Sequence, residues 1–271
     1  MNRMAAAAIH AAFLASASGA FAQEMPGMPS ATAPSPGVLI PRVQFRLYEF
    51  DDSQQLLEEN LRLEFGIARD LSVSFDLPVY QGFFDAPRPS DGAAGLGDAD
   101  LLAELRILRE DLNAVDTVRA ALFAGAELPT GTGGFTDPSL DPCVGGVFSA
   151  ITGRHGIDFA ARYTVVTGEG IPDPIFIGDL GEDLVNLDVG YAYRIAPAEY
   201  GEERVAAWYL TAELNTQLTT GGHREILLSP GLLIEAPTYA VEIGAGIPID
   251  EDVGRAERLD FSLLVGLRLL F

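Results

Sequence analysis

The stretch Leu259–Phe271 reads LDFSLLVGLRLLF, and every odd-numbered position in it is leucine, phenylalanine or valine. Asp260, Ser262, Gly266 and Arg268 fall among the even-numbered positions. Side chains of a β-strand point alternately to opposite faces of the sheet, so a period of two predicts a strand with one apolar and one polar face. The stretch is also much longer than the five or six residues of a typical soluble strand.

The same alternation recurs from residue 43 onward and predicts twelve strands. They lie near residues 43–50, 56–66, 70–80, 97–108, 116–128, 141–152, 156–167, 183–195, 206–218, 225–235, 238–247 and 257–271. Strands that cross a bilayer at a tilt need about 9–11 residues, and most of these segments are that long. Short turns mostly alternate with longer loops rich in glycine, proline and acid, as in outer-membrane barrels. The sequence therefore predicts an all-β, antiparallel transmembrane β-barrel of bacterial outer-membrane type over residues 42–271.

The first 41 residues do not share the alternation. Residues 1–22 have the features of a secretory signal peptide, namely Arg3, a short apolar run and the cleavage site Ala20-Phe21-Ala22. We expect this segment to direct secretion through the inner membrane to the outer membrane. Residues 23–41 contain five prolines, which favour an extended, Pro-rich periplasmic segment.

Composition excludes several classes of function. All 17 basic residues are arginine, and 39 acidic residues give a formal net charge of −22. Nucleic acid is excluded as a partner, because a phosphate-binding surface needs a basic face. The single cysteine, Cys143, excludes a disulfide framework and a cysteine-ligated zinc site.

If the apolar faces meet lipid, their polar partners line the barrel interior. The predicted pore-lining residues are Arg46, Glu58, Arg62, Glu64, Asp76, Glu104, Arg106, Arg119, Arg162, Asp188, Arg194, Glu213 and Arg268. Both signs of charge are present, so arginine–carboxylate pairs should form across the lumen. Two interpretations stay open: the pairs close the interior, or they border a narrow polar passage. Twelve strands fall between filled eight-stranded barrels and open 16-stranded porins.

Aromatic residues are expected where the barrel meets the two membrane surfaces. Tyr193, Trp208, Tyr239 and Phe271 fall on the outward face at the short-turn end, and Tyr80 falls near the long-loop end. An alternating apolar series that ends in Phe271 resembles the C-terminal signal of bacterial outer-membrane barrels. It implies the barrel-assembly machinery as a partner, beside outer-membrane lipid and lipopolysaccharide.

Enzymatic chemistry finds little support. His155 and His223, the histidines beyond the signal peptide, lie in predicted connections without a serine at motif spacing, so we predict no catalytic site, no cofactor and no metal site. Acidic loop residues could hold divalent cations that bridge to lipopolysaccharide phosphates, or could simply keep the loops soluble and apart.

Two short motifs resemble one known family. Gly95-Leu96-Gly97-Asp98 resembles the GLGD entry into a strand, and Leu128-Pro129-Thr130-Gly131 resembles the LPTG strand end, of the meta-pathway phenol-degradation family of outer-membrane proteins. The resemblance implies a barrel that passes hydrophobic or aromatic compounds, and it supplies no ligand residues. We read Asp98 as a rim residue rather than a calcium ligand.

These observations predict a passive outer-membrane channel for a small-molecule solute. The alternative is a non-conducting barrel with a structural or surface role in the envelope.

Overall fold

The computed structural model describes residues 24–51, 54–83, 94–113, 115–132, 135–136, 138–168, 177–179, 181–200, 205–254 and 256–270. The predicted signal peptide and Phe271 lie outside these ranges, so the structure does not bear on either. Within them, no helix is long and apolar enough to cross a membrane.

Thirteen strands form one antiparallel sheet in the described part of the chain. They are β1 (Leu39–Phe50), β2 (Gln54–Ala68), β3 (Leu71–Phe83), β4 (Ala94–Leu96), β5 (Ala99–Asp111), β6 (Thr117–Leu128), β7 (Asp141–Thr152), β8 (His155–Thr164), β9 (Leu184–Ala196), β10 (Ala207–Thr219), β11 (Arg224–Glu235), β12 (Tyr239–Asp252) and β13 (Leu259–Leu269). The short β4 pairs only with β3. The other twelve strands form the wall, which confirms the predicted fold class.

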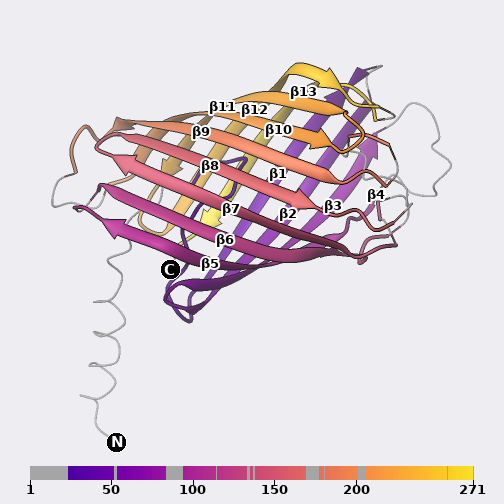
Figure 1. Cartoon of the computed structure of the whole chain (residues 1–271). Coiled ribbons are helices and arrows are strands. Elements are labelled where there is room, and N and C mark those ends of the chain that lie inside the picture. Colours follow the sequence, from indigo (N-terminus) through magenta and orange to yellow (C-terminus); the bar gives the residue numbers. More distant parts are fainter. Residues whose placement is uncertain are drawn as a thin grey trace, which may run out of the picture.

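The wall closes because β1 pairs on both sides. Val43 lies opposite Leu267 of β13 and opposite Leu61 of β2, and the sheet continues through neighbouring strands back to β2 and β3 (Figure 1). Closure pairs the backbone of every wall strand with two neighbours, and a bilayer demands this because lipid offers no hydrogen bonds. The connections fall into a short-turn end and a long-loop end of the barrel.

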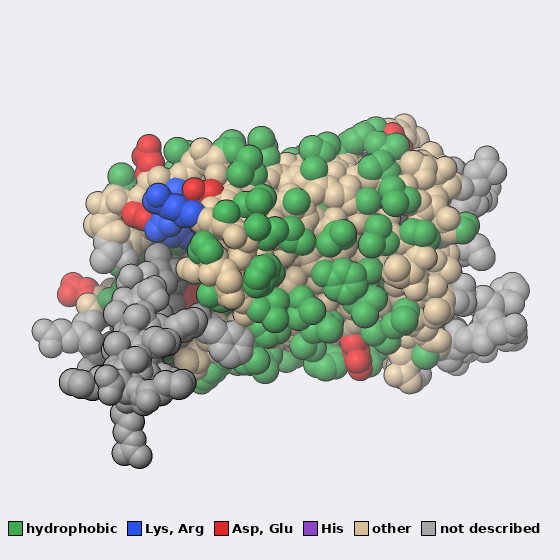
Figure 2. Space-filling view, turned by 90° about the horizontal axis from the view of Figure 1, so that it is seen from below, with side chains coloured by type: hydrophobic (Ala, Val, Ile, Leu, Met, Phe, Trp, Pro, Cys, Tyr) green, Lys and Arg blue, Asp and Glu red, His purple; other side chains and the backbone are tan. Residues whose placement is uncertain are grey.

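The outer face is apolar. On β13, Leu263 and Val265 expose 47% and 53% of their surface, whereas Ser262, Leu264 and Arg268 are buried in the interior. On the face seen in Figure 2, hydrophobic side chains are spread over the barrel wall and few charged groups lie among them. An apolar band of this extent is the surface that a barrel presents to hydrocarbon.

Two expectations about individual positions were wrong. Leu259 is buried and Asp260 is exposed, because the register with β1 shifts between Glu49 and Phe50. Tyr80 does not lie on the outer face; it is buried inside and its ring stacks on that of Phe135 at 5.4 Å.

The N-terminal segment differs most from expectation. The sequence predicted an extended periplasmic segment to residue 41, but β1 begins at Leu39 and residues 24–31 lie inside the barrel. Met25 and Met28 expose only 0% and 3% of their surface. An uncharged run of methionine, proline and alanine gains more by packing on the lumen wall than by staying in water.

Candidate functional site

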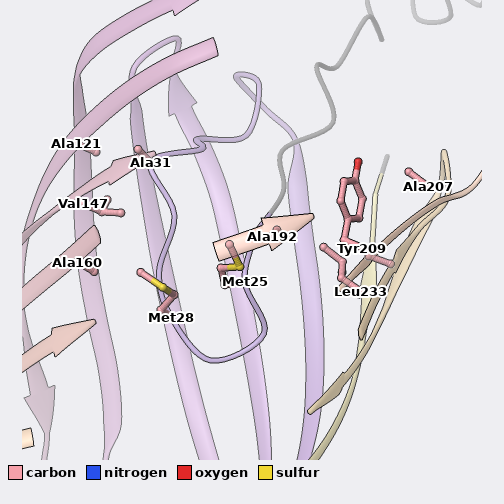
Figure 3. Close-up of a cluster of buried hydrophobic side chains, with 11 residues drawn as sticks. Met25, Met28, Ala31, Ala121, Val147, Ala160, Ala192, Ala207, Tyr209 and Leu233 are labelled. Carbon is pink, nitrogen blue, oxygen red and sulfur yellow. The ribbon is translucent and has the colours of Figure 1, made fainter. Parts of the chain in front are cut away.

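The N-terminal segment forms a plug, defined here as residues 24–36. Its apolar side chains pack on the wall: Met25, Met28 and Ala31 belong to one buried cluster with inward side chains of the strands. The wall members of this cluster are Ala121, Val147, Ala160, Ala192, Ala207, Tyr209, Leu233 and Ala240. Figure 3 shows the segment turning back on itself between these strands. Five of these eight wall residues are alanine, and their small side chains leave the space that the plug occupies.

Polar contacts fix the tip of the plug. The Gly27 amide donates to both carboxylate oxygens of Glu213, at 3.0 and 3.2 Å. The Pro26 carbonyl accepts from Arg42 Nη2 and from Gln44 Nε2, each at 2.8 Å. Because backbone groups buried away from water need partners, these wall side chains satisfy a segment that has no regular secondary structure of its own.

Two further contacts hold the plug on either side of its tip. Glu24 pairs with Arg268 of β13, which also lies 3.7 Å from Glu235 of β11. The Ala31 amide donates to Ser149 Oγ of β7 at 3.2 Å. The plug is therefore attached to strands on opposite sides of the lumen.

A cavity of about 360 Å³ lies next to the plug, with Pro26, Gly27 and Pro29 forming part of its lining. The structure brings eight of the thirteen predicted pore-lining residues together in its wall. They are Arg46, Arg62, Glu64, Asp76, Glu104, Arg162, Asp188 and Glu213.

The charges of the cavity wall are partly paired. Arg162 of β8 makes two parallel hydrogen bonds to Asp100 of β5, at 2.7 and 2.8 Å. Arg62 lies 3.7 Å from Asp76 on the neighbouring strand. Among the described residues, three arginines line the cavity against six carboxyl groups, those of Glu64, Asp76, Asp100, Glu104, Asp188 and Glu213. The wall thus carries an excess of acidic groups.

Five predicted residues point inward but do not line this cavity. Glu58 accepts a 2.7 Å hydrogen bond from the Tyr48 hydroxyl. Arg119 lies 3.6 Å from Asp111, and the Arg194 guanidinium lies 4.0 Å above the Tyr200 ring. The fourth, Arg268, holds Glu24 of the plug as described above.

The fifth, Arg106, holds the turn between β2 and β3. It donates from Nε and Nη2 to Asp70 Oδ1, at 3.1 and 2.8 Å, and to the Arg69 carbonyl. This hydrogen bonding lowers the pKa of Asp70 below its usual value.

Sequence reasoning missed several residues of the site. Arg42, Glu235 and the residues of the plug are all absent from the predicted pore-lining set. Glu235 is buried inside beside Arg268. The signal that could have found the plug is the pair Met25 and Met28, which are large apolar residues in a stretch that would otherwise be exposed.

An aromatic cluster lies inside the barrel near the long-loop end. Tyr48, Phe50, Leu56, Tyr80 and Phe135 are buried together there. Phe135 comes from the connection between β6 and β7, so a loop residue packs into the lumen. The cluster borders the cavity, or chamber, because Tyr48 belongs to both.

The two motifs that carry the family resemblance contact each other at the rim. Asp98 Oδ1 accepts from the Gly131 amide at 2.7 Å and from Thr136 Oγ1 at 2.9 Å. The Ala99 amide donates to Thr130 Oγ1 at 3.0 Å. Asp98 therefore acts as a structural acceptor that joins two loop ends.

Solved structures show the same fold. An outer membrane channel, the COG4313 channel of Pseudomonas putida F1, superposes with a TM-score of 0.56 and 15% identity, covering 93% of this chain and 99% of that chain. The NanC porin gives a TM-score of 0.52 and 12% identity, covering 86% of this chain and all of that one. No protein-family model matches the sequence, and no curated protein was found to be similar to it. At these identities the likeness establishes the fold of an outer-membrane barrel.

Proposed function

We propose that this protein is an outer-membrane channel for small solutes, closed at rest by its own N-terminal plug. The observation that carries the proposal is the charged chamber, which has plug residues in its lining and groups of both charges in its wall. In a barrel filled only for stability each buried charge should have a partner, because unpaired buried charges cost several kcal/mol each, whereas the carboxyl groups of this chamber outnumber its arginines. The two solved structures of the same fold are themselves a channel and a porin.

The chamber suits small amphipathic solutes. Its wall combines charged groups with apolar surface from Leu102, Phe123, Leu227 and Leu264. An aromatic ring that carries a polar or charged group could contact both kinds of surface. The two rim motifs, which contact each other through Asp98, further support a relationship to the meta-pathway phenol-degradation family and hence aromatic compounds as solutes.

The location follows from the same features. The exposed apolar band requires a bilayer, and the signal-like residues 1–22 would bring the chain across the inner membrane. Recognition by the barrel-assembly machinery through Phe271, and contact of the long loops with lipopolysaccharide, are part of this proposal.

Conductance across a planar lipid bilayer tests the proposal. The intact protein should show rare or small current steps, and deletion of residues 24–36 should give larger and longer ones. Met25→Ser/Met28→Ser is a second variant, since it weakens the apolar anchoring but keeps the chain length. If neither form shows steps at either polarity, and neither admits solutes into liposomes, the channel proposal is rejected.

A non-conducting envelope barrel is the second candidate. The tight fit of Met25 and Met28, together with the ion pairs that hold the plug, favours it. In that case the plug would serve stability alone, and its removal would lower the unfolding temperature without creating any current.

A further inference from the structure

The rim at the long-loop end contains a histidine surrounded by acids. His223 lies between β10 and β11, while Asp179 and Glu182 lie between β8 and β9. His223 Nε2 is 3.9 Å from Asp179 Oδ2 and 3.7 Å from Glu182 Oε1. One ligand atom from each of the three residues lies within 4.8 Å of the others.

These distances do not match hydrogen-bonded ion pairs. Charge-assisted N–H···O contacts are about 2.7–2.9 Å long. In a tetrahedral zinc site each ligand atom lies about 2.0–2.1 Å from the ion, so two ligand atoms lie roughly 3.3 Å from each other. The two separations from His223 Nε2 are about 0.4 and 0.6 Å wider than this, and the two carboxylate oxygens lie within 4.8 Å of each other, so side-chain rotation in these loops would bring the three ligands together. One imidazole and two carboxylates are a donor set that suits zinc and similar ions.

Two glycines allow this approach. A Cβ atom at Gly221 would lie 1.7 Å from Glu182 Oε1, so the carboxylate occupies space that any other residue would fill. Gly254, with a φ of +66°, lies against the imidazole, and a Cβ there would be 3.1 Å from His223 Nε2. Glu182 is fixed further by a hydrogen bond from the Asp179 amide to its Oε2, at 3.2 Å.

The arrangement is accessible to ions yet well supported. The side chains of Glu182 and His223 expose 17% and 21% of their surface, and that of Asp179 exposes 46%. On the other side of the ring, Nδ1 is buried, has no hydrogen-bond partner among the residues that the structure describes, and lies 3.7 Å from Asp252. A metal ion on Nε2 would favour the tautomer whose Nδ1–H faces this carboxylate, as second-sphere carboxylates do in known zinc sites.

We propose that Asp179, Glu182 and His223 form a binding site for Zn²⁺ at the long-loop rim. The ion would connect the β8–β9 loop to the β10–β11 loop, and Gly178 and Gly254, which form a bridge, extend the connection to the β12–β13 loop. The site is independent of the proposed channel function, because it lies outside the chamber.

Zinc titration of the untagged protein, purified from outer membranes and observed by calorimetry in excess Mg²⁺, tests the site. We expect one Zn²⁺ per chain, bound with nitrogen and oxygen ligands in the zinc X-ray absorption spectrum. His223→Gln should weaken binding at least about tenfold, as loss of even a second-sphere group does. His155→Gln is the matched control and should bind as the wild type does.

Gly221→Ala keeps every ligand and should nevertheless weaken binding, since its methyl group displaces the Glu182 carboxylate. Heat-modifiable gel mobility shows whether each variant is folded. The proposal is overturned if folded wild-type protein binds no zinc, if His223→Gln binds it as tightly, or if Mg²⁺ displaces the zinc completely.

Discussion

Arg42 of β1 and Glu242 of β12 form a buried ion pair whose members lie 200 residues apart in sequence. Arg42 Nε and Nη2 donate to one oxygen, Glu242 Oε2, at 3.0 and 2.8 Å, and the two side chains expose 8% and 0% of their surface. Gln44 Nε2 donates to the same oxygen at 2.8 Å. Because Arg42 and Gln44 also bind the Pro26 carbonyl, this pair connects the barrel wall to the plug.

Replacing Glu242 should therefore release the plug. Glu242→Gln leaves the Arg42 charge buried without its carboxylate, and breaking a buried pair in this way costs about 3–5 kcal/mol. Part of this cost is relieved if the plug leaves and water reaches Arg42. We expect more frequent channel opening in planar bilayers and faster thermolysin cleavage within residues 24–36.

An exposed ion pair provides the comparison for Glu242→Gln. Arg224 and Asp250 at the rim lie 2.6 Å apart, and their side chains are 44% and 45% exposed. Such surface pairs contribute about 0–1 kcal/mol, so Asp250→Asn should leave both opening and cleavage unchanged. Equal behaviour of the two variants would contradict a role of Glu242 in holding the plug.

Gly190 tests the apolar side of the plug. A Cβ atom at this β9 position would lie 2.7 Å from Met28 Sδ and 2.9 Å from Met25 Cγ. Gly190→Ala should push both methionines away from the wall and destabilise the plugged state by about 1–3 kcal/mol, the usual cost of overpacking. Increased conductance is the expected result.

Gly244 of β12 is the matched control for Gly190. Its added Cβ would have ordinary contacts, with the nearest atoms at 3.7 and 3.9 Å, although the residue also lines the lumen. Gly244→Ala should conduct like the wild type. If both alanine variants conduct alike, packing of the methionines on β9 does not keep the lumen closed.

The acidic excess of the chamber should make the open channel cation-selective. Six carboxyl groups face three arginines, and Glu104→Gln/Asp188→Asn reduces this excess from three (6 − 3) to one (4 − 3). The reversal potential in a KCl gradient reports the ratio of K⁺ to Cl⁻ permeability. At about pH 9, where carboxyl groups are ionised, that ratio should exceed one in a plug-deleted channel and fall towards one in the double variant.

Glu110→Gln checks that the chamber itself is responsible for the selectivity. Glu110 is exposed near the end of β5, away from the chamber lining, so its loss should not shift the reversal potential. A selectivity that responds to Glu110 as strongly as to Glu104 and Asp188 would assign the effect to the overall charge of the protein.

The sequence predicts the wall of this barrel well because alternation is a local property. Leu263, Val265 and Leu267 lie on the outer face as predicted, because successive residues of a strand point to opposite faces and these three are all at odd-numbered positions. The same alternation explains the error at Tyr80. Tyr80 lies an even number of residues from Ser72 and Ser74 and shares their inward face, whereas the prediction relied on its aromatic character.

Alternation does not give the position of an inward side chain along the barrel axis, nor the residue that it contacts, because both depend on distant parts of the chain. Arg162 lines the chamber while Arg106 holds a turn, although both are inward arginines on long strands. The plug could not be predicted at all from periodicity, because residues 24–36 have none. Its position depends on contacts such as Gly27 with Glu213, which are 186 residues apart.

The turn between β5 and β6 yields a prediction for pH. Asp116 accepts a 2.6 Å hydrogen bond from the Gly153 amide and another from the Asn113 side chain, and these bonds lower its pKa below the usual value near 3.9. Stability from this carboxylate is therefore present above about pH 4 and is lost as the pH falls through the lowered pKa. Asp116→Ala should lower the unfolding temperature in detergent micelles at neutral pH and much less at about pH 2.

Asn113→Ala also removes bonds to the Val115 and Asp116 amides, which do not titrate, so its effect should persist in acid. An Asp116→Ala effect of the same size at both pH values would contradict the assignment.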